Sequence, residues 1–286
     1  MICITGAGGT VGSEIVRQLG AANVPFRAAF FSKDKAEEAR RRGQHVALID
    51  YGRPDTLRAA FQDCDRLYLI GPNVPDQTRL ELNAVQAAQA AGVRHVVKQS
   101  AMRADEEAYV VGRIHRDVER AIEASGLSFT HLRPNSFMQN VLTFMAPTIR
   151  AEGVFYSAAG PARISHVDVR DISAVAVRAL TEAGHEGRAY TLTGPEAISY
   201  DELAGELSVA VGHAIRHVNL EPGDYRRGLM AEGLPEGLAD VMLDLERFFR
   251  EDGASSISRD VQRVTGRAPR RFQDFARECA PLLRAA

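Results

Sequence analysis

The sequence predicts an α/β protein: a doubly wound, Rossmann-like parallel sheet with a smaller, partly helical C-terminal lobe. Three observations support this fold class. Short β-branched or aromatic runs alternate with amphipathic stretches through the first half of the chain, a glycine-rich turn follows the first run, and the alternation stops after Arg133-Pro134. Repeated strand-helix units need long right-handed crossovers, so the strands are expected to lie parallel with helices on both faces.

The predicted elements follow in order along the chain. The strands are residues 2–5, 26–31, 45–49, 66–70, 95–99 and 128–133. The helices between them include residues 11–19, 34–42, 80–91 and 115–124. After Pro134 we expect an irregular stretch to residue 155, a helix over 172–180 capped by Asp171, a strand over 190–193, and helices over 200–211 and 239–250.

Composition limits the classes of partner. The 286 residues carry 35 Lys and Arg against 37 Asp and Glu, a net charge of −2, so no basic field predicts nucleic acid or an anionic membrane as a partner. The three cysteines, Cys3, Cys64 and Cys279, have no CxxC spacing and an odd count, which favours a reducing compartment. Without a signal-peptide pattern or a long apolar run, we expect a cytoplasmic protein.

The strongest local motif is Gly6-Ala7-Gly8-Gly9-Thr10-Val11-Gly12, which follows the first strand and opens the first helix. Glycines at such a turn let backbone N–H groups approach a pyrophosphate at a helix N-terminus, where the helix dipole favours anions. The alternative is a glycine-rich turn without a ligand. We therefore predict a dinucleotide-binding domain over 1–133, joined by later strands from about 163–194, and mostly a substrate-binding lobe over 134–286.

The Gly6-x-x-Gly9-x-x-Gly12 spacing resembles the atypical, NmrA-like branch of the short-chain dehydrogenases. Further stretches agree with that branch: Asp50-Tyr51, Leu69-Ile70-Gly71-Pro72, Gln99-Ser100-Ala101, residues 132–140, residues 166–172, residues 184–187 and Thr265-Gly266-Arg267. Within the branch the chain looks most like the bacterial NAD(P)H:quinone oxidoreductases and triphenylmethane reductases. The resemblance covers nearly the whole chain.

This resemblance implies NAD(P)H as the cofactor, with no flavin and no metal. It assigns the pyrophosphate to Gly6, Gly8, Gly9, Thr10, Val11 and Gly12, the adenine to Asp50 and Tyr51, the ribose to Ile70, Gly71, Pro72 and Asn73, and the nicotinamide region to Ser100, Ala101, Pro134 and Asn135. The expected substrate residues are Tyr109, Phe137, Met138 and Asn140, with Phe137 and Met138 as an apolar wall or as plain core.

Two pairs on or near one helix are candidates for proton transfer. Tyr109-x-x-x-Arg113 has the spacing of the usual Tyr-Lys pair, and the alternative is a surface tyrosine. His115-x-x-x-Glu119 matches the quinone-reductase relatives better, and Glu119 would fix the tautomer of His115 unless the two form an ordinary solvated pair. We predict His115 and Ser100 as catalytic. Two ligands on one helix without a third predict no metal site.

The absence of a clear proton donor favours an easily reduced acceptor. Reducing a quinone gives a phenolate-like anion, with a pKa near tyrosine's value of about 10, whereas reducing a ketone gives an alkoxide, near water's value of about 15.7. The sequence therefore predicts hydride transfer to a quinone or polycyclic aromatic, including the tailoring of an aromatic natural product. The alternative is a non-catalytic NAD(P)-binding redox sensor. A homodimer is a further expectation.

Cofactor preference depends on the end of the second strand. Phe31 stands where the quinone-reductase relatives carry an arginine, so a bidentate clamp on the phosphate of NADP is missing. Ser32 and Lys33 remain as a hydrogen-bond donor and a point charge, and Asp34 lies past the position that selects NAD. We predict discrimination within about tenfold, or about 1.4 kcal/mol.

Overall fold

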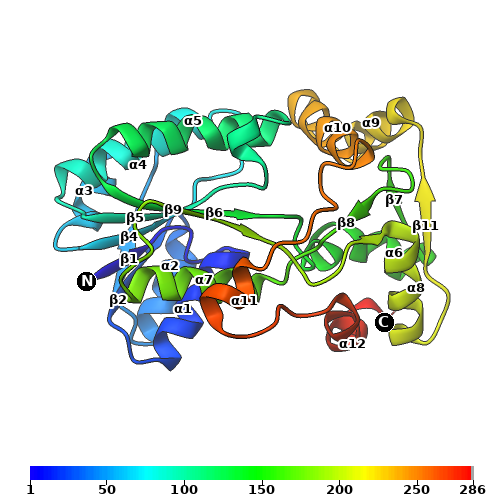
Figure 1. The fold of residues 1–286 in the computed structure, drawn as a ribbon, viewed down its shortest axis with the longest axis horizontal. Helices are drawn as coiled ribbons and strands as arrows, with labels where there is room; N and C mark the ends of the chain where they lie inside the picture. Colours follow the sequence, from blue (N-terminus) through cyan, green and yellow to red (C-terminus); the bar gives the residue numbers. More distant parts are fainter. Residues whose placement is uncertain (285–286) are drawn as a thin grey trace. The chain divides into compact units, whose positions relative to one another are not determined.

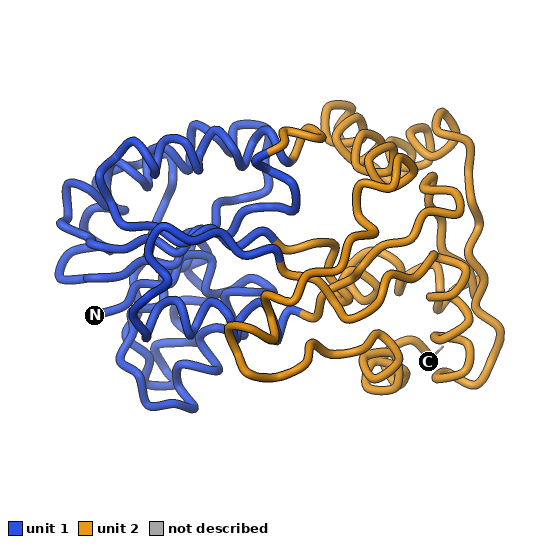
Figure 2. The backbone as a smooth tube through the Cα atoms, in the orientation of Figure 1, with its two compact units in different colours: residues 1–105, 112–133, 169–191 blue, residues 106–111, 134–168, 192–286 orange. Residues whose placement is uncertain are grey.

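The computed structural model describes residues 1–284, and the chain divides into two compact units (Figure 2). Unit 1 comprises residues 1–105, 112–133 and 169–191, and unit 2 comprises residues 106–111, 134–168 and 192–286. The sequence assigned 106–111 to the first domain. The structure places them in unit 2, where the backbone N–H of Val110 donates to Asp244 (2.6 Å) and the Tyr109 ring stacks on Phe248 (4.1 Å between centroids).

Unit 1 is built on a seven-stranded sheet with the order β3-β2-β1-β4-β5-β6-β9. The strands are β1 Ile2–Ile4, β2 Phe26–Phe30, β3 Val46–Leu48, β4 Arg66–Leu69, β5 His95–Gln99, β6 Ser128–Pro134 and β9 Arg188–Leu192. The pairings from β3 through β6 are parallel. Figure 1 shows α3, α4 and α5 over one face and α1, α2 and α7 over the other, so the predicted doubly wound fold is confirmed.

The helices of unit 1 lie close to the predicted positions, with three differences, the first being that the helix predicted over 115–124 begins at Val110. They are α1 Thr10–Ala21, α2 Lys33–Arg41, α3 Pro54–Phe61, α4 Gln77–Ala90, α5 Val110–Ala124 and α7 Val169–Thr181, with a 3-10 turn at Ala104–Glu106 before α5. The eight residues of α3 were not predicted; Pro54 begins this helix, and Leu57 and Phe61 are buried. Asp171 lies within the first turn of α7, so its assignment as the N-cap is wrong.

The core between the sheet and α3, α4 and α5 is mostly apolar. Its members include Leu57, Ala84, Val96, Val118 and Ile122. All five residues of β5 are buried, including two polar ones near its carboxyl end, Lys98 and Gln99. Buried polar groups need partners, so the carboxyl end of β5 must be surrounded by complementary side chains.

Unit 2 is partly helical, as predicted, but the expectation of an irregular stretch to residue 155 is wrong, because two helices over 141–152 and a strand from Val154 lie there. Its elements are the π-helix η2 Val141–Met145, α6 Ala146–Glu152, β7 Val154–Ser157, β8 Arg163–Ile164, β10 Ile198–Ser199, α8 Tyr200–Val211, β11 Arg216–Asn219, α9 Pro222–Ala231, α10 Glu236–Arg250, α11 Asp260–Thr265 and α12 Phe272–Leu283. β11 pairs parallel with β7, and β10 pairs antiparallel with β8. Among the described residues, no helix is long and apolar enough to cross a membrane.

Candidate functional site

The glycine-rich loop forms a cradle at the N-terminus of α1. Gly6 has φ +61°, and the N–H of Gly9 donates to the carbonyl of Gly6 (2.9 Å). A Cβ on Gly12 would lie 2.1 Å from the Gly6 carbonyl oxygen, so this close approach requires glycine. Gly9 is the N-cap of α1 and supplies no side-chain cap. The first N–H groups of a helix have no intrahelical acceptor, and here they lie beside a loop in which three of the four residues 6–9 are glycine, which suits a phosphate group.

The turn after β2 lies next to this loop. Phe31 is 77% exposed, and Ser32 is the N-cap of α2, accepting from the backbone N–H of Lys35 (3.3 Å). The ammonium of Lys35 donates to the Gly8 carbonyl (2.9 Å). Lys33 is exposed in the first turn of α2. Lys35, which the sequence analysis did not select, is therefore the lysine in contact with the loop.

The residues predicted at the adenine and the ribose belong to the turns after β3 and β4. The Asp50 carboxylate accepts from the Gly52 N–H (2.8 Å) and shapes its own turn. Tyr51 is buried, and its hydroxyl donates to the Ile70 carbonyl (2.5 Å), while burial raises the pKa of this phenol. Tyr51 therefore ties the two turns together as a neutral group. Gly71 and Pro72 follow half-buried, and Asn73 is exposed.

His115 is held by a buried lysine. Lys98, from β5, has no exposed side-chain surface, and its ammonium lies 3.1 Å from His115 Nδ1 and 2.8 Å from Glu81 Oε2 of α4. Burial, together with the charge of Lys98, keeps the pKa of His115 well below its usual range. The sequence analysis expected Glu119 to fix the tautomer of His115. That expectation is wrong, because the imidazole contacts Lys98 and the Glu119 carboxylate is bound elsewhere.

Glu119, one turn further along α5, binds Ser100 and Arg133. Ser100 Oγ donates to Glu119 Oε1 (2.7 Å), and Arg133 makes two hydrogen bonds to the carboxylate (2.9 and 2.8 Å). Burial would raise the pKa of Glu119, but the hydrogen bonds from Arg133 and Ser100 and the nearby positive charge lower it to about 2. Because the Ser100 hydroxyl hydrogen is directed at this carboxylate, Ser100 presents its oxygen lone pairs as acceptors.

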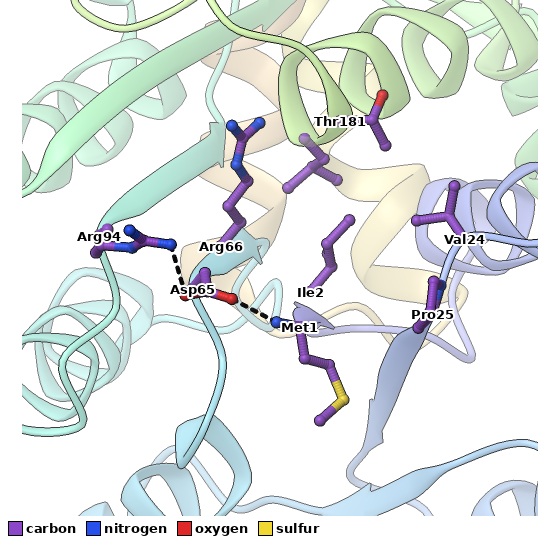
Figure 3. Close-up of a pocket in the computed structure, with 9 residues that line it drawn as sticks. Met1, Ile2, Val24, Pro25, Asp65, Arg66, Arg94 and Thr181 are labelled. Carbon is purple, nitrogen blue, oxygen red and sulfur yellow. Dashed lines mark hydrogen bonds and ion pairs between the residues drawn. The ribbon is translucent and has the colours of Figure 1, made fainter.

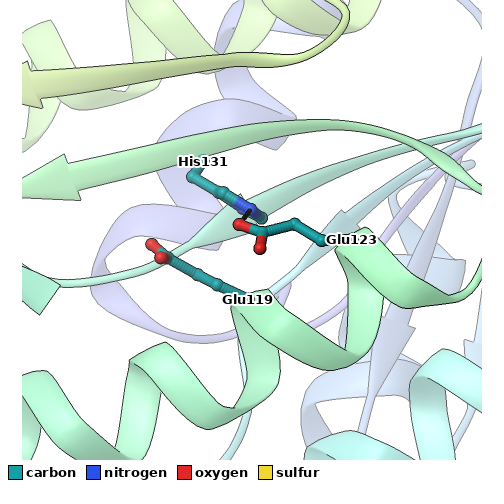
Figure 4. A group of neighbouring side chains, drawn as sticks. All are labelled: Glu119, Glu123 and His131. Carbon is teal, nitrogen blue, oxygen red and sulfur yellow. Dashed lines mark hydrogen bonds and ion pairs between the residues drawn. The ribbon is translucent and has the colours of Figure 1, made fainter. Parts of the chain in front are cut away.

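Glu119, Glu123 and His131 also form a group with the composition of a metal site. One ligand atom from each lies within 4.8 Å of the others, with both glutamates on α5 and His131 on β6 (Figure 4). Arg116 Nη1, however, contacts Glu119 (3.0 Å) and Glu123 (2.7 Å), and Arg133 binds Glu119 as well. Two guanidinium groups already balance the two carboxylates. This arrangement favours an ion-pair network over a divalent cation.

The residues predicted at the substrate lie in unit 2 and are held by that unit. Met138 is buried and its N–H donates to Val167 (2.9 Å); Phe137 forms a β-bridge with Val167 and is half-buried. Asn140 is half-buried, and its amide donates to Ser136 Oγ (3.3 Å). Tyr109 is buried against Phe248, and burial raises its pKa. The charge of Asp244 raises it further, which is the opposite of the lowered pKa that a catalytic tyrosine needs.

Two predicted nicotinamide residues also belong to unit 2. Asn135 directs its amide nitrogen to Ser165 Oγ and the Ala254 carbonyl (2.8 Å each), so its side-chain donor serves the unit's own structure. Pro134 is buried directly before it. In unit 1, Ala101 is buried next to Ser100. Their roles toward a cofactor remain predictions.

A cavity of about 380 Å³ lies at the opposite end of the unit 1 sheet (Figure 3). It is lined by Met1, Ile2, Val24, Pro25, Asp65, Arg66, Arg94, Leu180 and Thr181. Asp65 accepts from the terminal amine of Met1 (2.5 Å) and from Arg94 (2.7 Å), so these charges compensate one another. Ligands of open α/β sheets bind outside the carboxyl ends of the strands, whereas this cavity lies at the amino ends. It is distinct from the glycine-rich loop.

Comparison with known proteins identifies the family of this chain. Residues 1–276 match the NmrA-like family. An NAD(P)H azoreductase from Xenophilus azovorans is 39% identical over the full length of both chains. The crystal structure of an NADPH-dependent quinone oxidoreductase from Escherichia coli in complex with NADPH superposes with a TM-score of 0.88 at 31% identity, covering 97% of this chain and 99% of that one. Triphenylmethane reductase from Citrobacter sp. with NADP(H) gives 0.85 at 26% identity, covering 98% and 99%.

Proposed function

This chain belongs to the NmrA-like family, and from that premise we propose that it is an NAD(P)H-dependent oxidoreductase that reduces a quinone or polycyclic aromatic acceptor by hydride transfer. The observation that carries the proposal is the uncapped N-terminus of α1 beside a loop in which Gly12 has no space for a side chain. That cradle suits a dinucleotide pyrophosphate, and the similar proteins are named as reductases that use NADPH or NAD(P)H.

The turns at the carboxyl end of the unit 1 sheet are each proposed to contact one part of the cofactor. The glycine-rich loop and the N–H groups of α1 hold the pyrophosphate, Asp50 and Tyr51 flank the adenine, and residues 70–73 border the ribose. Ser32 and Lys33 lie at the adenosine end. Ser100 and Ala101, with Pro134 and Asn135, border the nicotinamide. The reduced nicotinamide, when bound, supplies the hydride, and the protein supplies binding and orientation.

The polar groups of unit 1 favour an acceptor that needs little help from an acid. Ser100 gives its hydrogen to Glu119 and presents acceptor lone pairs, and the pKa of His115 lies well below its usual range, so the site offers at most a neutral imidazole N–H as a donor and no strong acid. A phenolate-like product needs much less stabilisation than an alkoxide. The Phe137 and Met138 segment supplies an apolar surface, and Tyr109 and Asn140 complete the substrate residues. A planar quinone, an azo dye or an aromatic natural product fits these requirements.

The competing function is an NAD(P)-binding redox sensor without turnover. Both functions need the cofactor, so the experiment separates binding from chemistry. Purified protein is mixed with NADH or NADPH and a benzoquinone, a naphthoquinone or an azo dye, and loss of reduced-cofactor absorbance is followed. We expect turnover with at least one acceptor. Cofactor binding by calorimetry without turnover on any acceptor would favour the sensor.

A loop variant tests the cofactor site itself. Gly9 is exposed with φ −93°, which leucine can adopt, and the side chain of Gly9→Leu occupies the surface at which a pyrophosphate must approach. The new Cβ would lie 3.3 Å from the Gly6 carbonyl oxygen, and leucine is a poorer N-cap than glycine. We therefore expect loss of cofactor binding by calorimetry with a small fall in the denaturation midpoint. Gly20→Ala, at an exposed position of the same helix with open space around its Cβ, is the control. Unchanged cofactor affinity in Gly9→Leu would refute the assignment.

A further inference from the structure

Lys98 is a charged residue in the middle of the unit 1 core. Its ammonium contacts three acceptors: the Gln99 carbonyl, Glu81 Oε2 at 2.8 Å and His115 Nδ1 at 3.1 Å. An ammonium group has three donors and no acceptor. The nitrogen of His115 that faces it must therefore be the unprotonated one, and the ring hydrogen must lie on Nε2.

The partner of Lys98 is held as firmly as Lys98 itself. Glu81 is fully buried on α4, and its Oε1 accepts from Gln77 (2.8 Å). Gly71 lies directly against it, because a Cβ at Gly71 would be 2.4 Å from the Glu81 Cγ. Tyr68 of β4, which is also buried, donates a hydrogen bond to the side chain of Gln99, the residue after Lys98. Neither charge has room to move away from the other.

The charged and titratable groups around His115 come from four elements. They are Lys98 on β5, Glu119 on its own helix α5, and, beyond Lys98, Glu81 on α4 and Tyr68 on β4. Among these influences, the charge of Glu119 raises the pKa of His115, whereas burial and the charge of Lys98 lower it. Burial and Lys98 have the larger effect, so the pKa lies well below its usual range. Burial and the charge of Glu81 keep the Tyr68 phenol neutral by raising its pKa.

We propose that Lys98, paired with Glu81, is a positioning residue that fixes His115 as a neutral imidazole with its hydrogen on Nε2. This inference rests on the proposed function for its consequence: His115 would stabilise the developing anion by donating a hydrogen bond and would not act as an imidazolium acid. Turnover would then show no titration of this histidine between about pH 5 and 8, the range in which histidines usually titrate.

The first test observes the tautomer and needs no turnover. Long-range proton-nitrogen NMR of protein labelled with nitrogen-15 histidine reports which ring nitrogen carries hydrogen, and His115→Phe assigns the signal among the eight histidines. We expect a single Nε2–H form of His115 that does not titrate from about pH 5 to 8. An Nδ1–H form, or titration near the ordinary value of about 6.5, would overturn the proposal.

The second test removes the positioning pair. Lys98→Met alone would leave Glu81 buried without a partner, so it is combined with Glu81→Gln, which removes both charges together. We expect His115 in this double variant to show mixed tautomers or to titrate. Glu119→Gln is the control and should leave the His115 signal unchanged. If the His115 signal of the double variant matches that of the wild type, or if it changes only in Glu119→Gln, a group other than Lys98 fixes the tautomer.

The same variants connect the tautomer to the reaction. With a quinone that the wild type reduces, we expect the pH profile of kcat to be flat from about pH 5 to 8 and the double variant to gain a titration in that range. An identical flat profile in the double variant would overturn the role in turnover. If no acceptor is reduced, the proposed function fails while the NMR result still decides what Lys98 does.

Discussion

The glycine-rich loop and the polar groups of α5 both lie in unit 1, but they are built in different ways. The loop is one contiguous stretch, residues 6–12, that presents backbone N–H groups and depends on glycine at the positions where a Cβ would meet neighbouring atoms. The α5 groups depend on charged side chains that four separate elements bring together. His115 is held by Lys98 and Glu81, and Glu119 is held by Arg133 and Ser100.

The difference determines what each region tolerates. The loop is limited by space, so an added methyl group matters there even though no charge changes. The α5 groups are limited by charge balance, because a buried charge that loses its partner costs more than the pair itself contributes. A substitution that changes only side-chain volume should therefore destabilise the loop, and one that changes only charge should destabilise the α5 groups.

The largest effect is expected from Glu119→Leu. Arg133, with its side chain 11% exposed, loses one of its two carboxylate partners and keeps Asp105, and Arg116 keeps Glu123. Removing one partner of a buried pair costs about 3–5 kcal/mol, and because each arginine keeps one carboxylate we expect a loss at the lower end of this range in the free energy of unfolding measured with denaturant. Asp117→Ala, on the same helix, breaks an exposed contact with Arg120 and should cost under about 1 kcal/mol. Equal losses would contradict the comparison.

The pH dependence of stability follows from the same residue. The pKa of Glu119 is lowered to about 2 in the folded protein, below its value in the unfolded chain. A lowered carboxyl pKa stabilises above the unfolded value of about 4.3, and this stabilisation is lost as the pH falls toward 2. Glu119→Gln should therefore lose less stability than the wild type over that interval. If the wild type and Glu119→Gln lose the same free energy of unfolding as the pH falls, Glu119 does not contribute to the pH dependence of stability.

The next effect is expected from Gly12→Ala in the loop. The new Cβ would lie 2.1 Å from the Gly6 carbonyl oxygen, so backbone must move, and overpacking of this kind costs about 1–3 kcal/mol. Gly20→Ala in the same helix meets no atom within 4 Å and should instead stabilise by about 0.5–1 kcal/mol. Denaturation should therefore show a lower free energy of unfolding for Gly12→Ala and a higher one for Gly20→Ala. Equal changes in the two variants would mean that space does not limit the loop.

The sequence predicts the loop better than the α5 groups for a physical reason. A strand, a glycine-rich turn and a helix are adjacent in the chain, so their geometry follows from local residues. Lys98 and Glu81 lie far from His115 in sequence, and no local pattern specifies which of them meets it. One observation in the sequence points to the lysine: Lys98 directly follows the apolar residues Val96 and Val97 of a strand, which predicts a buried charge that needs a partner.

The same reasoning explains what was missed elsewhere. The two-stranded pairings of unit 2 have strands of only two to four residues, too short for an alternating pattern. Helix α3 has eight residues and a weak pattern for the same reason. The role of a catalytic or substrate-binding residue depends on the ligand as much as on the chain. The roles of Ser100, Phe137 and Asn140 therefore stay predictions.

A moderate effect is expected from His115→Ala on turnover. An essential general acid contributes about 10² to 10⁴-fold, but a neutral imidazole that assists a phenolate-like product should contribute about 100-fold or less. We expect kcat with a quinone to fall within that limit. His213→Ala, at an exposed position of unit 2, is the control and should leave kcat unchanged. A fall of several thousandfold would identify His115 as an essential acid and contradict the neutral-donor role.

The smallest effect is expected at the edge of the loop, where side-chain charge and backbone meet. Lys33 and Lys35 are both exposed, but only Lys35 is bonded to the loop, through the Gly8 carbonyl. Exposed ion pairs contribute about 0.2–1 kcal/mol, so the exposed Lys33 should change the affinity for the extra phosphate of NADPH by only a few fold. Dissociation constants for NADH and NADPH are measured for the wild type, Lys33→Ala and Lys35→Ala. We expect the affinities of the wild type for NADH and NADPH to differ by no more than about tenfold, and Lys33→Ala to weaken NADPH binding more than NADH binding.

Lys35→Ala should weaken the binding of both cofactors to a similar degree, because it loosens the loop that holds the shared pyrophosphate. A preference of several hundredfold in the wild type, or equal losses in Lys33→Ala, would show that the turn after β2 reads the cofactor in another way.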